Sequence, residues 1–260
     1  MSLGDHLREL RYRVVFSVIF IVLGMIAVAV FYNNFYEFLV RPWLQAKEIL
    51  SVTNPELSTQ MVLSGVAAPL TLAMKICAVG GLVLASPIWL YQIWAYIVPA
   101  LLAKEKRWAL LFLATALPLF LAGVAVGYLI LPQGISVLMS FTPQSVPITN
   151  LIEIDKFLEL MLQLMVVFGL GFLMPVVVVA ANLVGVLKAS TLAKSRLYVI
   201  FGTFVFGAAA TPSTDPFSML MLALPMLVLF FVAEVIARLV DRARGRNTAD
   251  QWADDEMSEL

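Results

Sequence analysis

The sequence predicts an all-α protein that crosses a membrane several times, with six transmembrane helices. Hydrophobic residues make up 62% of the chain and charged residues only 13%, whereas soluble domains are about 45–50% apolar and about 25% charged. The mean hydropathy is +0.95, and the apolar residues gather in long runs separated by polar segments. Because lipid offers no hydrogen bonds to the backbone, each run that crosses it has to be helical.

The six apolar runs differ in length, and together they predict one transmembrane domain over residues 1–240. They cover residues 14–31, 69–98, 108–131, 157–187, 197–210 and 217–237. A helix needs about 20 residues to cross a hydrocarbon core of about 30 Å. The fifth run has about 14 residues, which extend about 21 Å, so the fifth and sixth helices are expected to be short. The acidic segment 241–260 is expected to be a disordered cytoplasmic tail.

The segments outside the runs predict smaller helices at the membrane surface. Residues 2–13 are expected to form an amphipathic helix that lies at the interface and then turns into the first span. Its apolar residues recur at helical spacing: Leu3, Leu7, Leu10 and Val14. The segments 32–68 and 132–156 are long enough for short helices that lie flat and cap the outer face.

The distribution of lysine and arginine predicts the orientation. One set of loops and termini carries thirteen of these residues: Arg8, Arg11, Arg13, Lys104, Lys106, Arg107, Lys188, Lys194, Arg196, Arg238, Arg242, Arg244 and Arg246. The other set carries only Arg41, Lys47 and Lys156, with Lys75 inside the second run. Basic loops stay in the cytoplasm, so both termini are expected there.

Composition and motifs argue against several function classes. His6 is the only histidine and Cys77 the only cysteine, so no intrachain disulfide can form, and Cys77 is expected to be a small core residue. Spacings typical of zinc hydrolases, serine hydrolases or nucleotide-binding loops are missing from the sequence. The net charge of zero gives no basic nucleic-acid footprint. We therefore expect neither an enzyme nor a cofactor or metal site.

Two other membrane classes remain as alternatives. A small-solute or ion transporter would place charged or polar residues at the middle of the membrane, where this chain is almost entirely apolar. An intramembrane enzyme would need a nucleophile with a base, or paired aspartates, within the runs. The transporter is the stronger of the two.

Two glutamates next to the predicted spans have two interpretations each. Glu9 can form a surface pair with Arg13 at i,i+4, worth a few tenths of a kcal/mol, or it can present its carboxylate to an incoming cation. Glu105 lies between Lys104 and Lys106, which makes it a partly neutralised surface residue or a second such acceptor. The residues alone favour the surface interpretation for both.

Three features inside the runs concern packing. Gly123 and Gly127 form a GxxxG motif, which favours close packing within the chain over a dimer face. Lys75 is near enough to the outer end of its run for its amine to reach the interface. Gln163 is the only amide well inside the fourth run.

Several motifs together resemble one family. They are HLRELRYR before the first run, ASPIWLYQIWAYIVPALLAKEKR around the second loop, FLAGVAVGYLILP and FGLGFLMPVVVV in the third and fourth runs, and ATPSTDPFSMLMLALP between the last two. In this order they resemble TatC, the multispanning receptor subunit of the twin-arginine protein translocase, from His6 to about Arg238.

The resemblance implies a function and a set of partners. TatC-like proteins bind Arg-Arg signal peptides of folded precursor proteins at the cytoplasmic face of the bacterial inner membrane. They serve as the assembly platform for single-span TatA- and TatB-type subunits during export driven by the proton-motive force. A homo-oligomer within the receptor complex and the lipid bilayer itself complete the implied partners, and nucleic acid is not among them.

The resemblance also implies site residues. Glu9 and Glu105 correspond to the acidic positions that recognise the two arginines, with support from His6, Arg11 and Lys104. A guanidinium is a planar fork that matches a carboxylate, whereas lysine offers a point charge. The implied partner-contact region is the edge formed by the last two runs: Phe204, Gly207, Thr211, Pro212, Asp215 and Met219. Asp215 also suits an N-cap of the last helix.

Two positions depart from the family pattern. Leu173 and Phe231 stand where the family often has Glu or Gln, so the role of those polar groups does not transfer. Glu234, three residues after Phe231, either compensates for the missing acid or simply lies at the interface beside Arg238.

Overall fold

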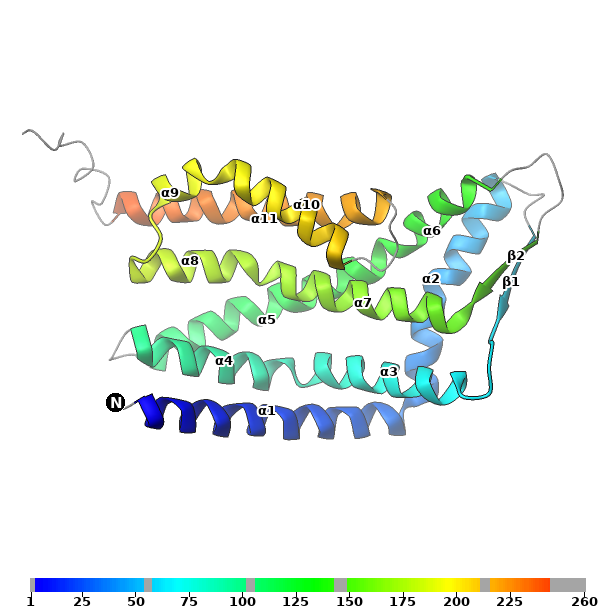
Figure 1. Cartoon of the computed structure of the whole chain (residues 1–260), viewed down its shortest axis with the longest axis horizontal. Helices are drawn as coiled ribbons and strands as arrows, with labels where there is room; N and C mark the ends of the chain where they lie inside the picture. Colours follow the sequence, from blue (N-terminus) through cyan, green and yellow to red (C-terminus); the bar gives the residue numbers. More distant parts are fainter. Residues whose placement is uncertain (1–2, 54–57, 102–105, 143–148, 211–215, 244–260) are drawn as a thin grey trace, which may run out of the picture.

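The computed structural model describes residues 3–53, 58–101, 106–142, 149–210 and 216–243. Its elements, in order, are α1 (Leu3–Val30), α2 (Tyr32–Thr53), β1 (Ser58–Val62), α3 (Ala68–Leu84), α4 (Ser86–Leu101), α5 (Lys106–Leu129), α6 (Leu131–Ser140), β2 (Thr149–Glu153), α7 (Ile154–Phe172), α8 (Met174–Val184), α9 (Ala189–Lys194), α10 (Arg196–Ala210) and α11 (Pro216–Ala243). The long helices run side by side (Figure 1), which confirms the all-α class.

The apolar helices confirm a multi-pass membrane protein. Among the described residues, four stretches are long and apolar enough to cross a membrane: Leu7–Val30, Phe112–Ser140, Ile154–Leu183 and Met219–Ala243. The bent pair Ala68–Leu84 and Ser86–Tyr96 makes a fifth, and the short helix Arg196–Ala209 falls on the fifth apolar run. Every apolar run thus falls on helices, and the count of six crossings stays a prediction compatible with them. The last helix is longer than the run 217–237, because it continues through its basic end to Ala243.

The second and fourth spans are each broken near a proline. A bend of 57° separates α3 from α4, where Pro87 lies in the first turn of α4 and cannot donate a backbone hydrogen bond. The indole Nε1–H of Trp89 donates to the carbonyl of Leu82, 2.9 Å away, at this break. Pro175 lies in the first turn of α8, after the break at Leu173.

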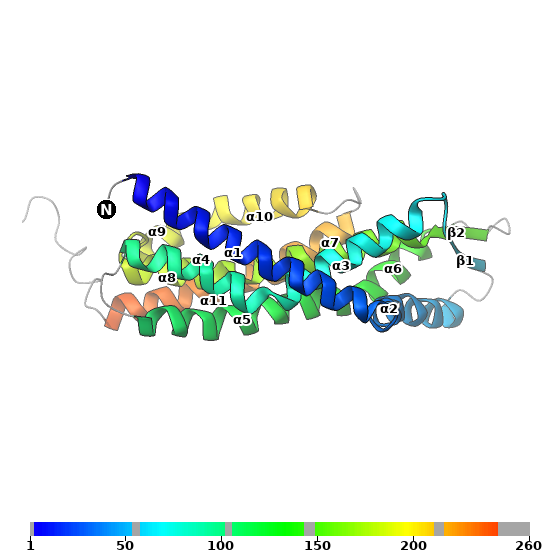
Figure 2. The ribbon, with the colours of Figure 1, turned by 90° about the horizontal axis from the view of Figure 1, so that it is seen from below.

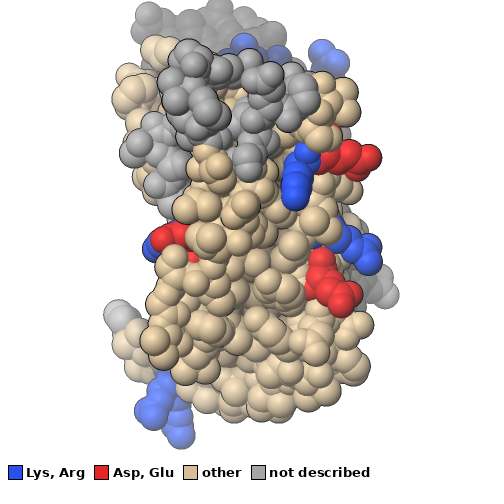
Figure 3. Space-filling model, turned by 90° about the vertical axis from the view of Figure 1, so that its right-hand side faces the viewer, with Lys and Arg blue, Asp and Glu red and all other residues tan. Residues whose placement is uncertain are grey.

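One end of the bundle is capped, as the long outer segments predict. Helix α2 runs across the ends of the spans and α6 lies beside it (Figure 1). The cap also holds a parallel strand pair that the sequence did not predict, β1 with β2, in register from Ser58↔Thr149 to Val62↔Glu153. Charged side chains on this capped end form a few separate groups among uncharged atoms (Figure 3).

A proline in α2 leaves a backbone carbonyl that accepts a hydrogen bond from α5. Pro42 lies inside α2 and has no N–H, so it cannot donate to the carbonyl of Phe38 one turn earlier. The hydroxyl of Tyr128 on α5 donates to that carbonyl instead, at 2.8 Å. The aromatic rings of Phe38 and Tyr128 also stack, with their centroids 4.4 Å apart.

Glycines set the closest helix contacts. A Cβ on Gly123 would lie 2.4 Å from the carbonyl oxygen of Phe168, and one on Gly127 would lie 3.0 Å from that of Leu164. The GxxxG motif therefore packs α5 against α7 within the chain. Helix α1 crosses α3 in the same way (Figure 2), since a Cβ on Gly24 would lie 2.8 Å from the carbonyl oxygen of Gly81.

Two boundaries differ from the sequence predictions. Residues 3–30 form one continuous helix, so the interfacial helix 2–13 does not turn before the first span; the helical spacing simply continues across residue 14. The expected disordered tail from residue 241 also begins too early, because α11 reaches Ala243 and the side chain of Asp241 is buried.

Candidate functional site

The predicted peptide site lies at the end of the bundle opposite the cap. Helix α1 begins there, α4 ends there at Leu101 and α5 begins there at Lys106 (Figure 1). We call it the N-terminal end. Helix α1 packs against α4, and α4 in turn packs against α5.

Glu9 is already engaged by an arginine of its own helix. Its Oε1 accepts hydrogen bonds from Arg13 Nε at 3.0 Å and Nη2 at 2.6 Å, which is the i,i+4 pair that the spacing predicts. Arg13 Nη1 also donates to Oε1 of Gln92 on α4, at 3.1 Å. Among the residues that the structure describes, no donor contacts the second oxygen of Glu9. Within the described part of the chain, the carboxylate is therefore oriented through one oxygen, and its other oxygen accepts no hydrogen bond.

The other residues of the predicted peptide site are only partly described. Arg11 is exposed on α1, and His6 lies in α1 with a side chain outside the description. Lys104 and Glu105 lie outside the described residues. The structure therefore places Glu9 at the N-terminal end and does not test its pairing with Glu105.

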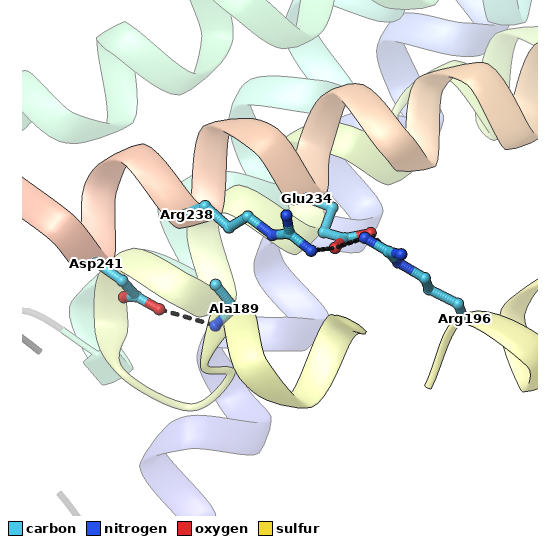
Figure 4. Close-up of polar contacts among 5 residues, drawn as sticks. All are labelled: Ala189, Arg196, Glu234, Arg238 and Asp241. Atoms are coloured by element: carbon cyan, nitrogen blue, oxygen red, sulfur yellow. Dashed lines mark hydrogen bonds and ion pairs between the residues drawn. The ribbon is translucent and has the colours of Figure 1, made fainter. Parts of the chain in front are cut away.

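A buried glutamate joins the last two helices at this end. Glu234 on α11 is 2% exposed, and its carboxylate accepts from Arg196 Nε at 2.9 Å and Nη2 at 2.6 Å. Arg238, one turn later on α11, also donates to it (Figure 4). Glu234 thus pairs with two arginines. The Arg196 guanidinium also lies 5.9 Å from the ring centroid of Phe231, the position where the family often has an acid.

Asp241 makes a second buried polar contact on the same helix, and helical spacing is its only signal in the sequence. Its Oδ2 accepts from the backbone N–H of Ala189, at 2.8 Å (Figure 4), which satisfies a free donor at the start of α9. Its Oδ1 accepts from Asn182 Nδ2 at 3.0 Å. Glu234, Arg238 and Asp241 are spaced i, i+4 and i+7, so they lie on one face of α11.

The predicted partner edge has two sides. Gly207 is buried against α11, where a Cβ would lie 3.2 Å from the carbonyl oxygen of Met219, while Phe204 is half-buried. The outward side of α10 carries exposed apolar side chains: Leu197, Tyr198, Phe201, Val205 and Phe206. Thr211, Pro212 and Asp215 lie outside the described residues.

Lys75 has a partner that the sequence analysis missed. Its Nζ lies 3.0 Å from Glu159 Oε2 on α7, and Lys156 Nζ lies 3.8 Å from the same oxygen. Lys75 therefore pairs across the bundle instead of only reaching the interface. Glu159 lies 84 positions away in sequence, so no local spacing signals the pair. Within the described part of the chain, no group of three or more metal-binding side chains occurs.

Comparison with known proteins identifies the fold and the family. Residues 5–225 match the family model described as Sec-independent protein translocase protein (TatC). The Frankia casuarinae protein of that name is 33% identical over 267 residues, covering 100% of this chain and 73% of its own length. The Aquifex aeolicus protein is 31% identical, covering 94% and 98%.

Solved structures agree with this match. A crystal structure of the twin arginine translocase receptor TatC covers 90% of this chain and 98% of its own, at 31% identity and a TM-score of 0.76. With its apolar helices and bacterial relatives, the chain is a multi-pass bacterial membrane protein. It belongs to the TatC family, as a subunit of the Sec-independent protein translocase.

Proposed function

We propose that the N-terminal end of this translocase subunit binds the Arg-Arg signal peptides of folded precursors, through Glu9 and Glu105. The observation that carries the proposal is the carboxylate of Glu9, which Arg13 orients through Oε1 while Oε2 stays open among the described residues. The subunit acts as a receptor within the translocase and not as an enzyme.

The chemistry of Glu9 suits a guanidinium. Arg13 lies between Glu9 and Gln92 of α4, so the carboxylate is fixed relative to two helices before a peptide arrives. Pre-orientation reduces the ordering that binding requires. One arginine of the signal peptide can donate to Oε2 of Glu9 without displacing Arg13. The second arginine of the peptide would then bind Glu105.

Peptide affinity tests this proposal. Each charge-assisted contact contributes about 1.5–3 kcal/mol, which is roughly ten- to hundred-fold in affinity. Glu9→Gln and Glu105→Gln should each weaken an Arg-Arg peptide by that factor and weaken a Lys-Lys peptide less, measured on the purified full chain. Glu159→Gln, at the other end of the bundle, is the matched control. Unchanged Arg-Arg affinity in the Glu9→Gln/Glu105→Gln double variant would remove the proposed site.

We also propose that both termini face the cytoplasm. The asymmetry of lysine and arginine supports this orientation, because the described members of the basic set lie on helices and connections at the N-terminal end. Lys104, Arg244 and Arg246 belong to the same set by sequence. The peptide site would then face newly made precursors.

The outward side of α10 supports a docking site for single-span TatA- or TatB-type subunits during export driven by the proton-motive force. Helix α10 has only 15 residues, extends about 22 Å and packs mainly on α11. A short apolar helix favours local thinning of the bilayer or association with a partner helix. Photocrosslinkers at Phe201 and Val205, on the exposed side of α10, should capture a single-span subunit. Capture only from sites on α1 would show that the partner docks elsewhere.

A further inference from the structure

An apolar groove opens on the side of the bundle near the capped end. Its volume is about 440 Å³, and α2, α3, α5 and α7 line it. The floor is buried and includes Leu39, Ile76 and Val124, whereas Leu84 and Leu129 at the rim are exposed. The groove is therefore closed at its base and open to the surroundings of the spans.

The end of the groove beneath α2 is built by the Phe38–Tyr128 contact. Both residues line it, and the stacked rings and the hydrogen bond to the Phe38 carbonyl hold α2 in place above α5. The groove therefore does not depend on a bound partner for its shape.

A cation, Arg41, lies near this end of the groove, close enough to the lining residue Tyr128 to act on its hydroxyl electrostatically. Arg41 is three residues after Phe38 on α2, and residues at this spacing share one side of a helix. Arg41 is exposed, and it forms no ion pair with any residue that the structure describes. Helix α2 runs across the ends of the spans (Figure 1), where a membrane-spanning bundle meets the lipid headgroups. Glu37, one turn earlier, is the neighbouring acid on α2.

The size and lining of the groove suit a small apolar ligand such as a lipid chain. Its volume falls within the range of about 300 to 1,000 Å³ that is typical of small-molecule sites. Its lining is apolar, as an acyl chain requires.

We propose that this groove binds one acyl chain of a glycerophospholipid from the leaflet at the capped end, with the lipid phosphate on Arg41. The apolar lining accepts the chain and selects no headgroup. Arg41 supplies the preference for phosphate, and for lipids with no ammonium group to neutralise it. The bound lipid would exchange more slowly than its neighbours in the bilayer, because a buried floor holds its chain.

The test is photolabelling of the full chain in nanodiscs of phosphatidylcholine that contain a small fraction of phosphatidylglycerol with a diazirine near the end of one acyl chain. Labels should map by mass spectrometry to residues that line the groove. Ala125→Phe, at an exposed lining position, should remove most of this labelling. Ala122→Phe, on the same helix and exposed outside the lining, should leave it unchanged.

The role of the Arg41 charge is tested in the same labelling experiment. A basic residue near an anionic surface is worth about fivefold in lipid association, so Arg41→Gln should lower groove labelling by phosphatidylglycerol about fivefold. Lys47→Gln, on the same helix, should not. Inorganic phosphate, compared with chloride at equal ionic strength, should leave the labelling intact; displacement by phosphate would indicate an anion site only.

Three results would overturn the proposal. Besides displacement by phosphate, they are even labelling over the apolar surface, equal labelling of Ala125→Phe and Ala122→Phe in variants that melt like the parent, and crosslinking of the groove to a single-span subunit in place of lipid. If Ala125→Phe does not fold, the Arg41→Gln and Lys47→Gln pair decides alone.

Discussion

Replacing Gly123 by alanine should separate the two central helices. A Cβ at this position would lie 2.4 Å from the carbonyl oxygen of Phe168, about 1 Å closer than the roughly 3.3–3.6 Å of ordinary C–H to carbonyl contacts. The obstacle is backbone of α7, so no side-chain rotation can relieve it. Helices α5 and α7 make the most extensive helix contact in the described bundle, and both must move.

The size of the effect follows from two opposing terms. Overpacking a tight contact costs about 1–3 kcal/mol, and a rigid backbone neighbour places Gly123→Ala at the upper end. Alanine in a helix gains about 1 kcal/mol over glycine. The expected net loss is about 2 kcal/mol, which lowers the midpoint of thermal unfolding by roughly 4–8 °C in a chain of this size.

Gly202 supplies the matched control for this measurement. It lies inside α10, and a Cβ there would meet no atom within 4 Å, so Gly202→Ala should gain up to about 1 kcal/mol from helix propensity alone. Thermal unfolding of both variants in detergent, followed by circular dichroism, gives the comparison. A Gly123→Ala protein as stable as the parent would refute the reasoning.

Three further changes test other contacts. Glu234→Gln should destabilise the protein by about 2–3 kcal/mol in the same unfolding assay, because it removes a buried charge held by two arginines; a shift below 0.5 kcal/mol would make the ion pairs incidental. Tyr128→Phe should lower the free energy of unfolding by about 1 kcal/mol in the parent, and by less in a Pro42→Ala background, where residue 42 regains its N–H. Equal losses in both backgrounds would show that the Tyr128 hydroxyl does not replace the hydrogen bond that Pro42 cannot donate to the carbonyl of Phe38. Cysteines at Asn54 and Gln144 in a cysteine-free chain should react with an impermeant thiol reagent on intact cells, and protection of both would reverse the proposed orientation.

The sequence predicted the helices that a lipid environment requires. Each apolar run falls on helices, because a hydrocarbon solvent leaves the backbone no other choice, and the glycine motif placed α5 tightly on a neighbour. Hydropathy could not predict whether residues 2–13 turn before the first span, because the same spacing serves an interfacial helix and a continuous one.

Contacts between distant segments were beyond prediction. The pair of Lys75 with Glu159 and the capping of Ala189 by Asp241 join residues far apart in the chain. Without a map of which helices are neighbours, Asp241 was assigned to the expected tail, and no local spacing connected Glu159 with Lys75. The pair of Glu9 with Arg13 could be predicted because it is local to one helix turn.

The contact of Asp241 bears on the order in which the protein is assembled. Most helix pairs in the bundle, such as α1 with α3 and α4 with α5, join spans that are neighbours along the chain, so they can form as each new span enters the membrane. The fourth span is different, because α8 packs on α11 and α9 begins under Asp241. The half of the fourth span that we propose to face the cytoplasm therefore completes its packing only after the ribosome has made the whole of the last span. Until then the backbone N–H at the start of α9 lacks the acceptor that Asp241 provides. Assembly is thus completed by a residue near the end of that span, which closes a part of the fold made long before it.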